Sequence, residues 1–237
     1  MAERKRGGCL VCGQDLVYYE TARQMTCVFC GKTENSHASC RDGHYVCDVC
    51  HEKKGIQVVM RECMSSSLRD PILILQKIMQ DPYIYMHGPE HHIMAGAALL
   101  AAYHNCGGSL DLPMALQEMK ERGSQIPGGA CGFWGCCGAA VSTGIYMSIV
   151  TGATPLGGRT WGLSNRMTGR ALQAIGEIGG PRCCKRDTFT AVREAVKMTG
   201  EELGVCMELP EKIVCTFSAE NPQCRKQTCP YYAGAQV

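Results

Sequence analysis

The stretch CLVCGQDLVYYETARQMTCVFCGKTENSHASCRDGHYVCDVC, residues 9–50, contains four pairs of metal-ligand residues, each pair separated by two residues. The pairs are Cys9 and Cys12, Cys27 and Cys30, His37 and Cys40, and Cys47 and Cys50. A two-residue gap lets one tight turn direct both side chains at the same ion, and two such turns complete a tetrahedron that suits zinc. The residues between the pairs are polar and turn-rich, with too few apolar side chains to fold unaided. The stretch therefore predicts a small module held together by two zinc ions rather than by a hydrophobic core.

The pattern leaves open the nitrogen ligand and the wiring of the two sites. His44 follows Cys40 by four residues and can replace His37, and His51 is a third candidate. Sequential wiring, in which the first two pairs share an ion as in stacked zinc ribbons, is favoured because residues 9–30 form a complete ribbon pattern. Cross-braced wiring, as in RING-like modules, is the alternative. Closed zinc sites are mostly structural, and basic residues here are nearly matched by acidic ones. We therefore expect a scaffold or docking element for a protein partner rather than a nucleic-acid reader.

The rest of the composition points to a reducing compartment. The chain has 237 residues, a formal charge of +2 and 18 cysteines. So small a charge does not favour a nucleic-acid or membrane partner. The start lacks the apolar run of a signal peptide, and the longest apolar stretch, residues 93–103, is too short to span a bilayer. We therefore expect a cytoplasmic protein of an anaerobe, whose cysteines serve as metal ligands or reactive thiols rather than as disulfides.

From residue 63 onward the pattern is that of a mostly α-helical domain. Apolar residues recur at helical spacing from Ile72 to Met79. Further helices are predicted over residues 93–103, 112–122, 137–150, 161–178 and 182–198. Strand signals are weak except at residues 205–209 and 213–217, and neither a dinucleotide-binding loop nor a P-loop is present. We predict a zinc-ribbon-like or cross-braced module over residues 1–62 and a helical domain over residues 63–237 with an irregular, cysteine-bearing tail.

Two pairs of adjacent cysteines each follow a glycine-rich run and open a predicted helix. The first pair is Cys136 and Cys137, and the second is Cys183 and Cys184, which three basic residues flank. The helix dipole, the free amides and nearby cations favour a thiolate, the form that binds metal or attacks a substrate. If the two helix ends face each other, up to four thiolates converge. The alternative is that these small side chains are buried in tight helix packing.

Other residues could supply acid–base groups or cofactor ligands. The segment HGPEHH, residues 87–92, has three histidines and a carboxylate, of which His91 and His92 are the acid–base candidates. A helix cap with solvated histidines is an equal alternative. The candidate ligands for a cofactor in this domain are Cys131, Cys215, Cys224 and Cys229. A proline follows Cys229, a step common beside iron–sulfur ligands, although the tail cysteines can also form a disulfide or simply pack.

The segments MHGPEHH, CGFWGCCGAA, GGPRCCKR and CPYY make the chain similar to an uncharacterised cysteine-rich family of anaerobic archaea and bacteria. Some members of that family are described as, or fused to, SAM-dependent methyltransferases. The resemblance covers nearly the whole chain and implies no established activity, and neither a glycine-rich SAM loop nor a CxxxCxxC run is present. The CCG triplet also weakly resembles the cysteine-rich domains of heterodisulfide reductases, which have CxxC where this chain has its second CC.

These patterns lead to one main functional hypothesis and two alternatives. We expect a metal-dependent enzyme of thiol, sulfur or redox chemistry, with an iron–sulfur cluster as the candidate cofactor of the helical domain. Its catalytic candidates are Cys136, Cys137, Cys183, Cys184, His91 and His92. One alternative is a non-catalytic, zinc-stapled adaptor for a partner enzyme such as a methyltransferase. The other is an RNA-binding protein that carries out sulfur chemistry. The substrate stays open in all three.

Overall fold

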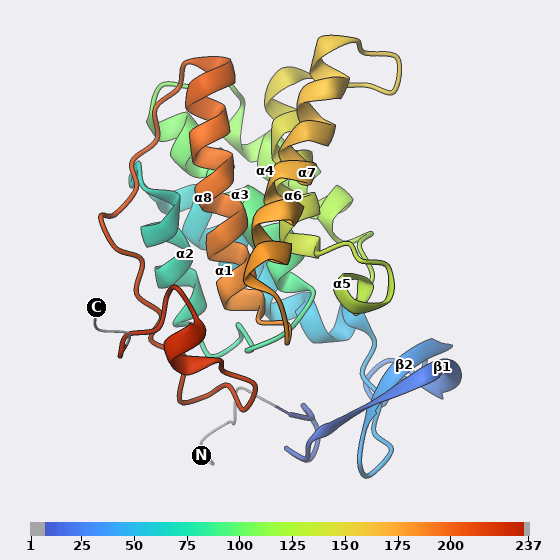
Figure 1. Ribbon diagram of the computed structural model, residues 1–237. Helices are drawn as coiled ribbons and strands as arrows, with labels where there is room; N and C mark the ends of the chain where they lie inside the picture. Colours follow the sequence, from blue (N-terminus) through green and yellow to red (C-terminus); the bar gives the residue numbers. More distant parts are fainter. Residues whose placement is uncertain (1–7, 235–237) are drawn as a thin grey trace.

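The computed structural model describes residues 8–234, in which a small two-stranded sheet precedes a body of eight α-helices (Figure 1). Strand β1 (Leu16–Thr26) pairs antiparallel with β2 (Thr33–Cys40), and the register is irregular between Tyr18 and Arg23. The buried residues between positions 8 and 47 are Cys9, Cys27, Ser39, Cys40 and Cys47. Because four of these five are cysteines, the hairpin has no apolar core of its own.

Helix α1 (Asp48–Ser65) joins the hairpin to the helical body. Its first turn carries Cys50, whereas Val58, Val59 and Cys63 further along are buried in the main core. The helix runs without a break through residue 62, where the sequence predicts a domain boundary. Hairpin and helical body are therefore connected by a rigid element that belongs to both.

The core of the body is organised around α3 (Glu90–Asn105), which is buried along most of its length. Its apolar residues are surrounded by four other helices and α1. The surrounding helices are α2 (Pro71–Met79), α4 (Leu112–Gly123), α6 (Gly138–Thr151) and α8 (Cys184–Leu203). Helix α7 (Arg159–Ile178) covers α6 and α8, and the one-turn helix α5 (Ala130–Phe133) lies near the hairpin (Figure 1). Gly96 allows α3 and α6 to pack closely, since a Cβ atom at this position would lie 2.8 Å from the carbonyl oxygen of Ser142.

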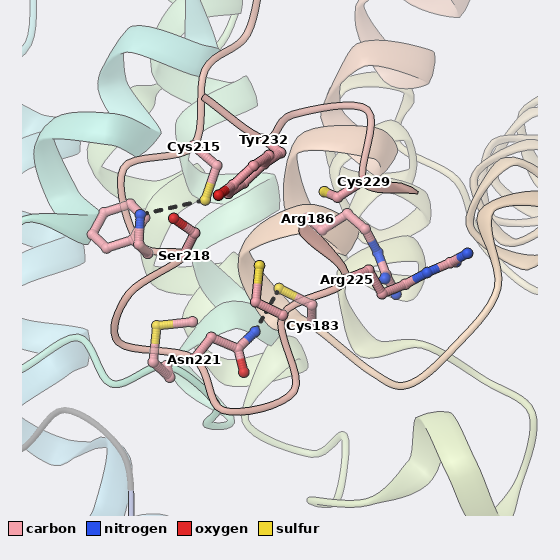
Figure 2. Close-up of a pocket in the computed structure, with 11 residues that line it drawn as sticks. Cys183, Arg186, Cys215, Ser218, Asn221, Arg225, Cys229 and Tyr232 are labelled. Carbon is pink, nitrogen blue, oxygen red and sulfur yellow. Dashed lines mark hydrogen bonds between the residues drawn. The ribbon is translucent and has the colours of Figure 1, made fainter. Parts of the chain in front are cut away.

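The tail after α8 returns along α8 and α2 to the N-terminal end of α8 (Figure 1). The side chain of Gln76 donates a hydrogen bond to the carbonyl of Val214, and the hydroxyl groups of Thr190 and Tyr231 lie 3.0 Å apart. The predicted strands over residues 205–209 and 213–217 are wrong, because the described part of the tail forms only an isolated bridge between Cys215 and Tyr232 and the short helix η1 (Lys226–Thr228). Several cysteines of this segment gather beside α8 (Figure 2).

Among residues 8–234 the helices are all too short or too polar to cross a bilayer. The architecture is thus a mostly helical body with a small cysteine-rich hairpin at one end.

Candidate metal centres and an adjoining cleft

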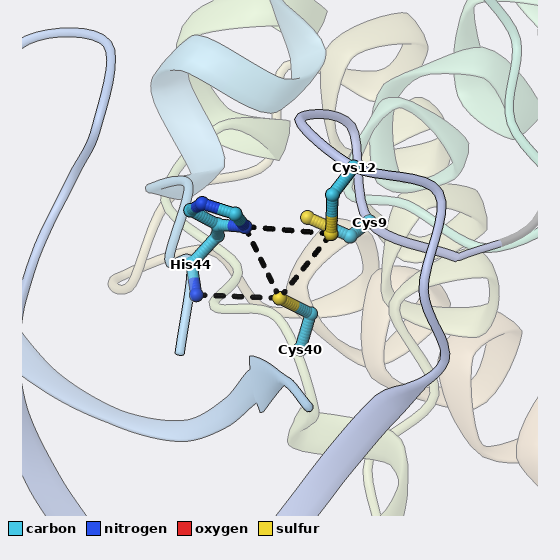
Figure 3. Close-up of side chains that lie close together, drawn as sticks. All are labelled: Cys9, Cys12, Cys40 and His44. Carbon is cyan, nitrogen blue, oxygen red and sulfur yellow. Dashed lines mark hydrogen bonds between the residues drawn. The ribbon is translucent and has the colours of Figure 1, made fainter. Parts of the chain in front are cut away.

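Two groups of four side chains in the N-terminal module have all their ligand atoms within 4.8 Å of one another. The first comprises Cys9, Cys12, Cys40 and His44 (Figure 3), and the second comprises Cys27, Cys30, Cys47 and Cys50. The sulfur atoms of Cys12 and Cys40 lie 3.7 Å apart, as do those of Cys30 and Cys47. Sulfur ligands placed tetrahedrally at about 2.3 Å from one zinc ion lie about 3.8 Å apart. Each group therefore has the size of a closed site for a single metal ion such as zinc.

The wiring is cross-braced, and the favoured sequential wiring is wrong. The first pair shares one group with Cys40 of the third pair, and the second and fourth pairs share the other. The register of the hairpin explains this, because Leu16 pairs with Cys40 and so sets Cys40 beside the turn that precedes β1. The second turn follows β1, where a bridge between Cys27 and Tyr45 sets it beside Cys47. Pairs that are neighbours in the sequence thus lie at opposite ends of one strand.

The structure places His44, rather than His37 or His51, among the ligands. The Nδ1 atom of His44 lies 3.4 Å from the Cys12 sulfur and 3.5 Å from the Cys40 sulfur. The ring of His37 stacks on Phe133 with centroids 4.2 Å apart, and its Nδ1 lies 3.0 Å from the carbonyl oxygen of Tyr19. The Nδ1 of His51 lies 3.7 Å from Oε2 of Glu90. His37 and His51 therefore connect the hairpin and α1 to the helical body.

Backbone hydrogen bonds reach several of the module cysteines and favour the thiolate form of Cys27 in particular. Burial by itself raises the pKa of Cys27, but hydrogen bonds with the backbones of Cys47, Phe29 and Cys30 outweigh it and lower the pKa to about 6. The amides of Val11 and His44 likewise donate to the sulfurs of Cys9 and Cys40, at 3.4 and 3.3 Å. A thiol ionised at neutral pH binds a metal ion without first losing a proton.

A third set of cysteines lines a pocket between α8 and the tail (Figure 2). Its members are Cys183, Cys215, Cys224 and Cys229, and we call this the tail pocket. Three of the four sulfurs accept a hydrogen bond. The donors are the Asn221 side chain to Cys183 at 3.5 Å, the Phe217 amide to Cys215 at 3.4 Å and the Lys226 amide to Cys224 at 3.4 Å.

The sulfurs of the tail pocket are spaced more widely than those of the N-terminal module. Within residues 8–234, the two N-terminal groups alone have three or more ligand atoms all within 4.8 Å of one another. Basic side chains also surround this pocket, since Arg186 and Arg225 line it and the ammonium of Lys185 lies 5.0 Å from the centre of the Phe217 ring. The sequence predicts Cys215, Cys224 and Cys229 as a set but puts Cys131, rather than Cys183, with them.

The adjacent cysteines do lie at helix starts, but they do not converge as four thiolates. Cys137 is the N-cap residue of α6, and Cys183 is the N-cap residue of α8. Cys183 lines the tail pocket, Cys137 lines a separate cleft, and Cys136 lines neither of the two. Burial raises the pKa of Cys137 to about 12 and that of Cys183 to about 11, and it also raises the pKa of Cys184. The expectation of lowered thiol pKa values is therefore wrong for these three cysteines, because loss of hydration outweighs the helix terminus.

The cleft that contains Cys137 lies between the hairpin, α5, α7 and the start of α8, and has a volume of about 610 Å³. Cys131 also lines it, together with Tyr18 and Phe133. Arg186 lines both this cleft and the tail pocket, so that the two are separated by little more than one side chain. The remaining lining residues include Leu172, Ile175, Arg182, Asp187 and several glycines.

The two histidines predicted as acid–base groups, His91 and His92, line neither the tail pocket nor the cleft. His91 is 1 % exposed, and burial lowers its pKa well below the usual value. The Nδ1 of His92 lies 3.0 Å from the carbonyl oxygen of Ile126, and burial lowers its pKa too. Both rings are thus neutral packing groups at neutral pH.

Comparison with known proteins identifies a family for most of the chain. Neither the curated proteins nor the solved structures contain a match to the chain. One family model, described as a family of unknown function (DUF5714), matches residues 59–232. The matched part holds all four cysteines of the tail pocket and leaves out the eight ligands of the N-terminal groups. The chain belongs to the DUF5714 family of unknown function.

Proposed function

We propose that this protein is an iron–sulfur oxidoreductase whose cluster is bound by Cys183, Cys215, Cys224 and Cys229. The observation that carries the proposal is that four thiols, separated by up to 46 residues in the sequence, line one pocket. Thiolate is the ligand that iron–sulfur clusters use, and four of them complete the usual set. The family match supports placing the function in this domain, since it covers all four cysteines.

A cluster explains the spacing better than a single ion. Sulfurs bound to different irons of a cluster lie further apart than sulfurs bound to one ion, and the tail-pocket sulfurs are spread more widely than the N-terminal groups. Hydrogen bonds from Asn221, Phe217 and Lys226 reach three of the sulfurs. Such bonds stabilise negative charge on thiolate sulfur and tune the potential of a cluster.

The residues around the tail pocket suit a charged cofactor. The guanidinium of Arg225 offsets part of the negative charge of the four thiolates, and the buried guanidinium of Arg186, paired with Asp187, lines the pocket beside it. Met86 and Phe217 supply apolar walls that limit the access of water. When bound, a cluster supplies one-electron transfer, and these side chains would hold it, screen it and connect it through Arg186 to the cleft.

We propose zinc for the two N-terminal groups, with a structural role. Each has four protein ligands and no open position, as is typical of structural zinc sites. The distances between their sulfurs match those expected around one zinc ion. The hairpin lacks an apolar core, so that metal binding would supply most of the free energy that folds it.

Reconstitution with ferrous iron and sulfide under strictly anaerobic conditions tests the cluster. We expect the full-length protein to take up iron and to develop the broad visible absorbance of an iron–sulfur cluster. Cys183→Ser and Cys224→Ser should lose both signals while keeping their zinc and their circular dichroism spectrum. The matched control is Cys206→Ser, because Cys206 is an exposed cysteine of the same tail outside the pocket. Full iron uptake by the two pocket variants, or none by the unmodified protein, would overturn the proposal.

A further inference from the structure

We propose that the cleft between the hairpin and α7 is a binding site for a small organic anion with an apolar, planar body. The proposal concerns a site separate from the tail pocket and does not require that the tail pocket hold a cluster. Its volume of about 610 Å³ lies within the range of about 300–1,000 Å³ that small-molecule sites occupy.

The anionic end of the ligand is assigned to Arg182. Its guanidinium lies over the ring of Tyr18, 5.0 Å from the ring centroid, and donates a hydrogen bond to the Tyr18 hydroxyl. Among residues 8–234 no carboxylate forms an ion pair with Arg182, whereas the guanidinium of Arg186 is bound to Asp187 at 2.9 Å. Arg182 therefore brings a positive charge to the cleft that this part of the chain does not neutralise, and a guanidinium binds carboxylate, phosphate or sulfonate through two parallel hydrogen bonds.

The body of the ligand is assigned to the apolar and aromatic lining. Leu172 and Ile175 of α7 form one wall, and Phe133 of α5, which is 47 % exposed, belongs to another. One face of the Phe133 ring stacks on His37, and a partly exposed aromatic ring of this kind favours flat partners that stack on it or pack against its edge. Tyr18 contacts Arg182, the cationic group of the cleft, so the hairpin contributes directly to the site.

Two glycines keep the cleft open. A Cβ atom placed on Gly132 or on Gly176 would meet no other atom within 4 Å, although both residues line the cleft. Larger side chains at these positions would fit the fold and would fill the cleft instead. Gly169, on the same helix as Gly176, also has free space around it and lies outside the cleft. Substitutions at Gly176 and Gly169 are therefore a matched pair, because a larger side chain enters the cleft at the first position and stays outside it at the second.

A fluorescence titration with two related probes tests the proposal on the full-length protein. Anilinonaphthalene sulfonate has an aromatic body with an anionic group, and phenylnaphthylamine has a similar body without the charge. We expect saturable binding of the sulfonate at one site. Because a charge-assisted hydrogen bond contributes about 1.5–3 kcal/mol, Arg182→Gln should weaken sulfonate binding by about tenfold or more and leave the neutral probe nearly unchanged.

The glycine variants test the location. We expect Gly176→Leu to abolish saturable binding of both probes and Gly169→Leu to leave it unchanged, with both variants showing the circular dichroism of the unmodified chain. If Gly176→Leu unfolds, Gly132→Leu makes the same test from the α5 wall. Equal binding by the cleft and control variants, an equal loss of both probes in Arg182→Gln, or no saturable binding at all would overturn the proposal. None of these outcomes depends on iron uptake, so the proposed cluster and the proposed ligand site are tested independently.

Discussion

The pKa of a cysteine in this protein is decided by backbone hydrogen bonds at some positions and by burial at others. In the module, backbone hydrogen bonds outweigh burial and lower the pKa of Cys27 to about 6. At the start of α6, burial outweighs the helix terminus and raises the pKa of Cys137 to about 12. A helix end stabilises a nearby charge by about 0.3–1 kcal/mol, whereas burial can shift a pKa by several units. A position at a helix start is therefore not enough to identify a reactive thiolate.

Cys137 should accordingly be unreactive at neutral pH. Only the thiolate is alkylated, and a thiol with a pKa of about 12 is almost entirely protonated at pH 7. With iodoacetamide and mass spectrometry, we expect exposed Cys206 to be labelled first and the labelling of Cys137 to accelerate about tenfold per pH unit as the pH rises towards 12. Labelling of Cys137 as fast as Cys206 at pH 7 would show that burial does not protect it.

The nitrogen ligand of the first zinc site can be tested with two histidine variants. His44→Ala removes one of four ligands and should lower the zinc content from two ions per chain to one. His37→Ala is the control, because His37 stacks on Phe133 outside both groups and its loss should leave two zinc ions bound. Zinc analysis by mass spectrometry measures both. One zinc ion in the His37 variant and two in the His44 variant would reverse the assignment.

At the scale of elements, hydrophobic periodicity was enough to predict most helices. The predicted helix over residues 112–122 corresponds to α4, and that over 161–178 corresponds to α7. The favoured sequential wiring of the hairpin is wrong and the cross-braced alternative is found, because spacing identifies ligands whereas strand register decides which of them meet. The tail is irregular, as predicted, but the strands expected within it do not form, since its apolar residues Ile213 and Phe217 pack on the body without them. The place of Cys183 beside the tail cysteines depends on that packing.

The contact between α6 and α7 gives a prediction at this scale. A Cβ on Gly144 would lie 1.9 Å from Oγ1 of Thr168 and 3.0 Å from the carbonyl oxygen of Ser164. Gly144→Ala should therefore lower the free energy of unfolding by about 1–3 kcal/mol, as overpacking does. Gly169→Ala, exposed on α7 with no atom near its Cβ, should raise it by about 0.5–1 kcal/mol through helix propensity. Chemical denaturation measures both changes, and shifts of the same sign would contradict the close packing of these helices.

At the scale of the whole molecule, the N-terminal module is attached to the helical body at two points besides α1. Tyr18 contacts Arg182, and His37 contacts Phe133. Glu90 of α3 is fully buried and faces His51, the residue next to the ligand Cys50. Burial by itself raises the pKa of Glu90, but its interaction with His51, whose Nδ1 lies 3.7 Å away, outweighs this and lowers the pKa to about 2. Glu90 is therefore a carboxylate at neutral pH that connects the second cysteine group, through His51, to the core.

Removal of zinc should unfold the hairpin and leave the helical body folded. The body has its own apolar core, whereas the buried residues of the hairpin are mainly metal ligands. After treatment with a strong chelator, we expect the helical circular dichroism signal to persist and proteolysis to become fast within residues 8–47. Loss of the helical signal together with the zinc would mean that the body depends on the module for its stability.

The central claim is that the tail pocket binds an iron–sulfur cluster, and the most direct test is the metal content of the protein purified without oxygen. If the claim is right, each chain will contain two zinc ions together with about four iron and about four sulfide ions, the content of a cluster with one thiolate on each iron. A third zinc ion in place of iron, or zinc alone, would contradict it.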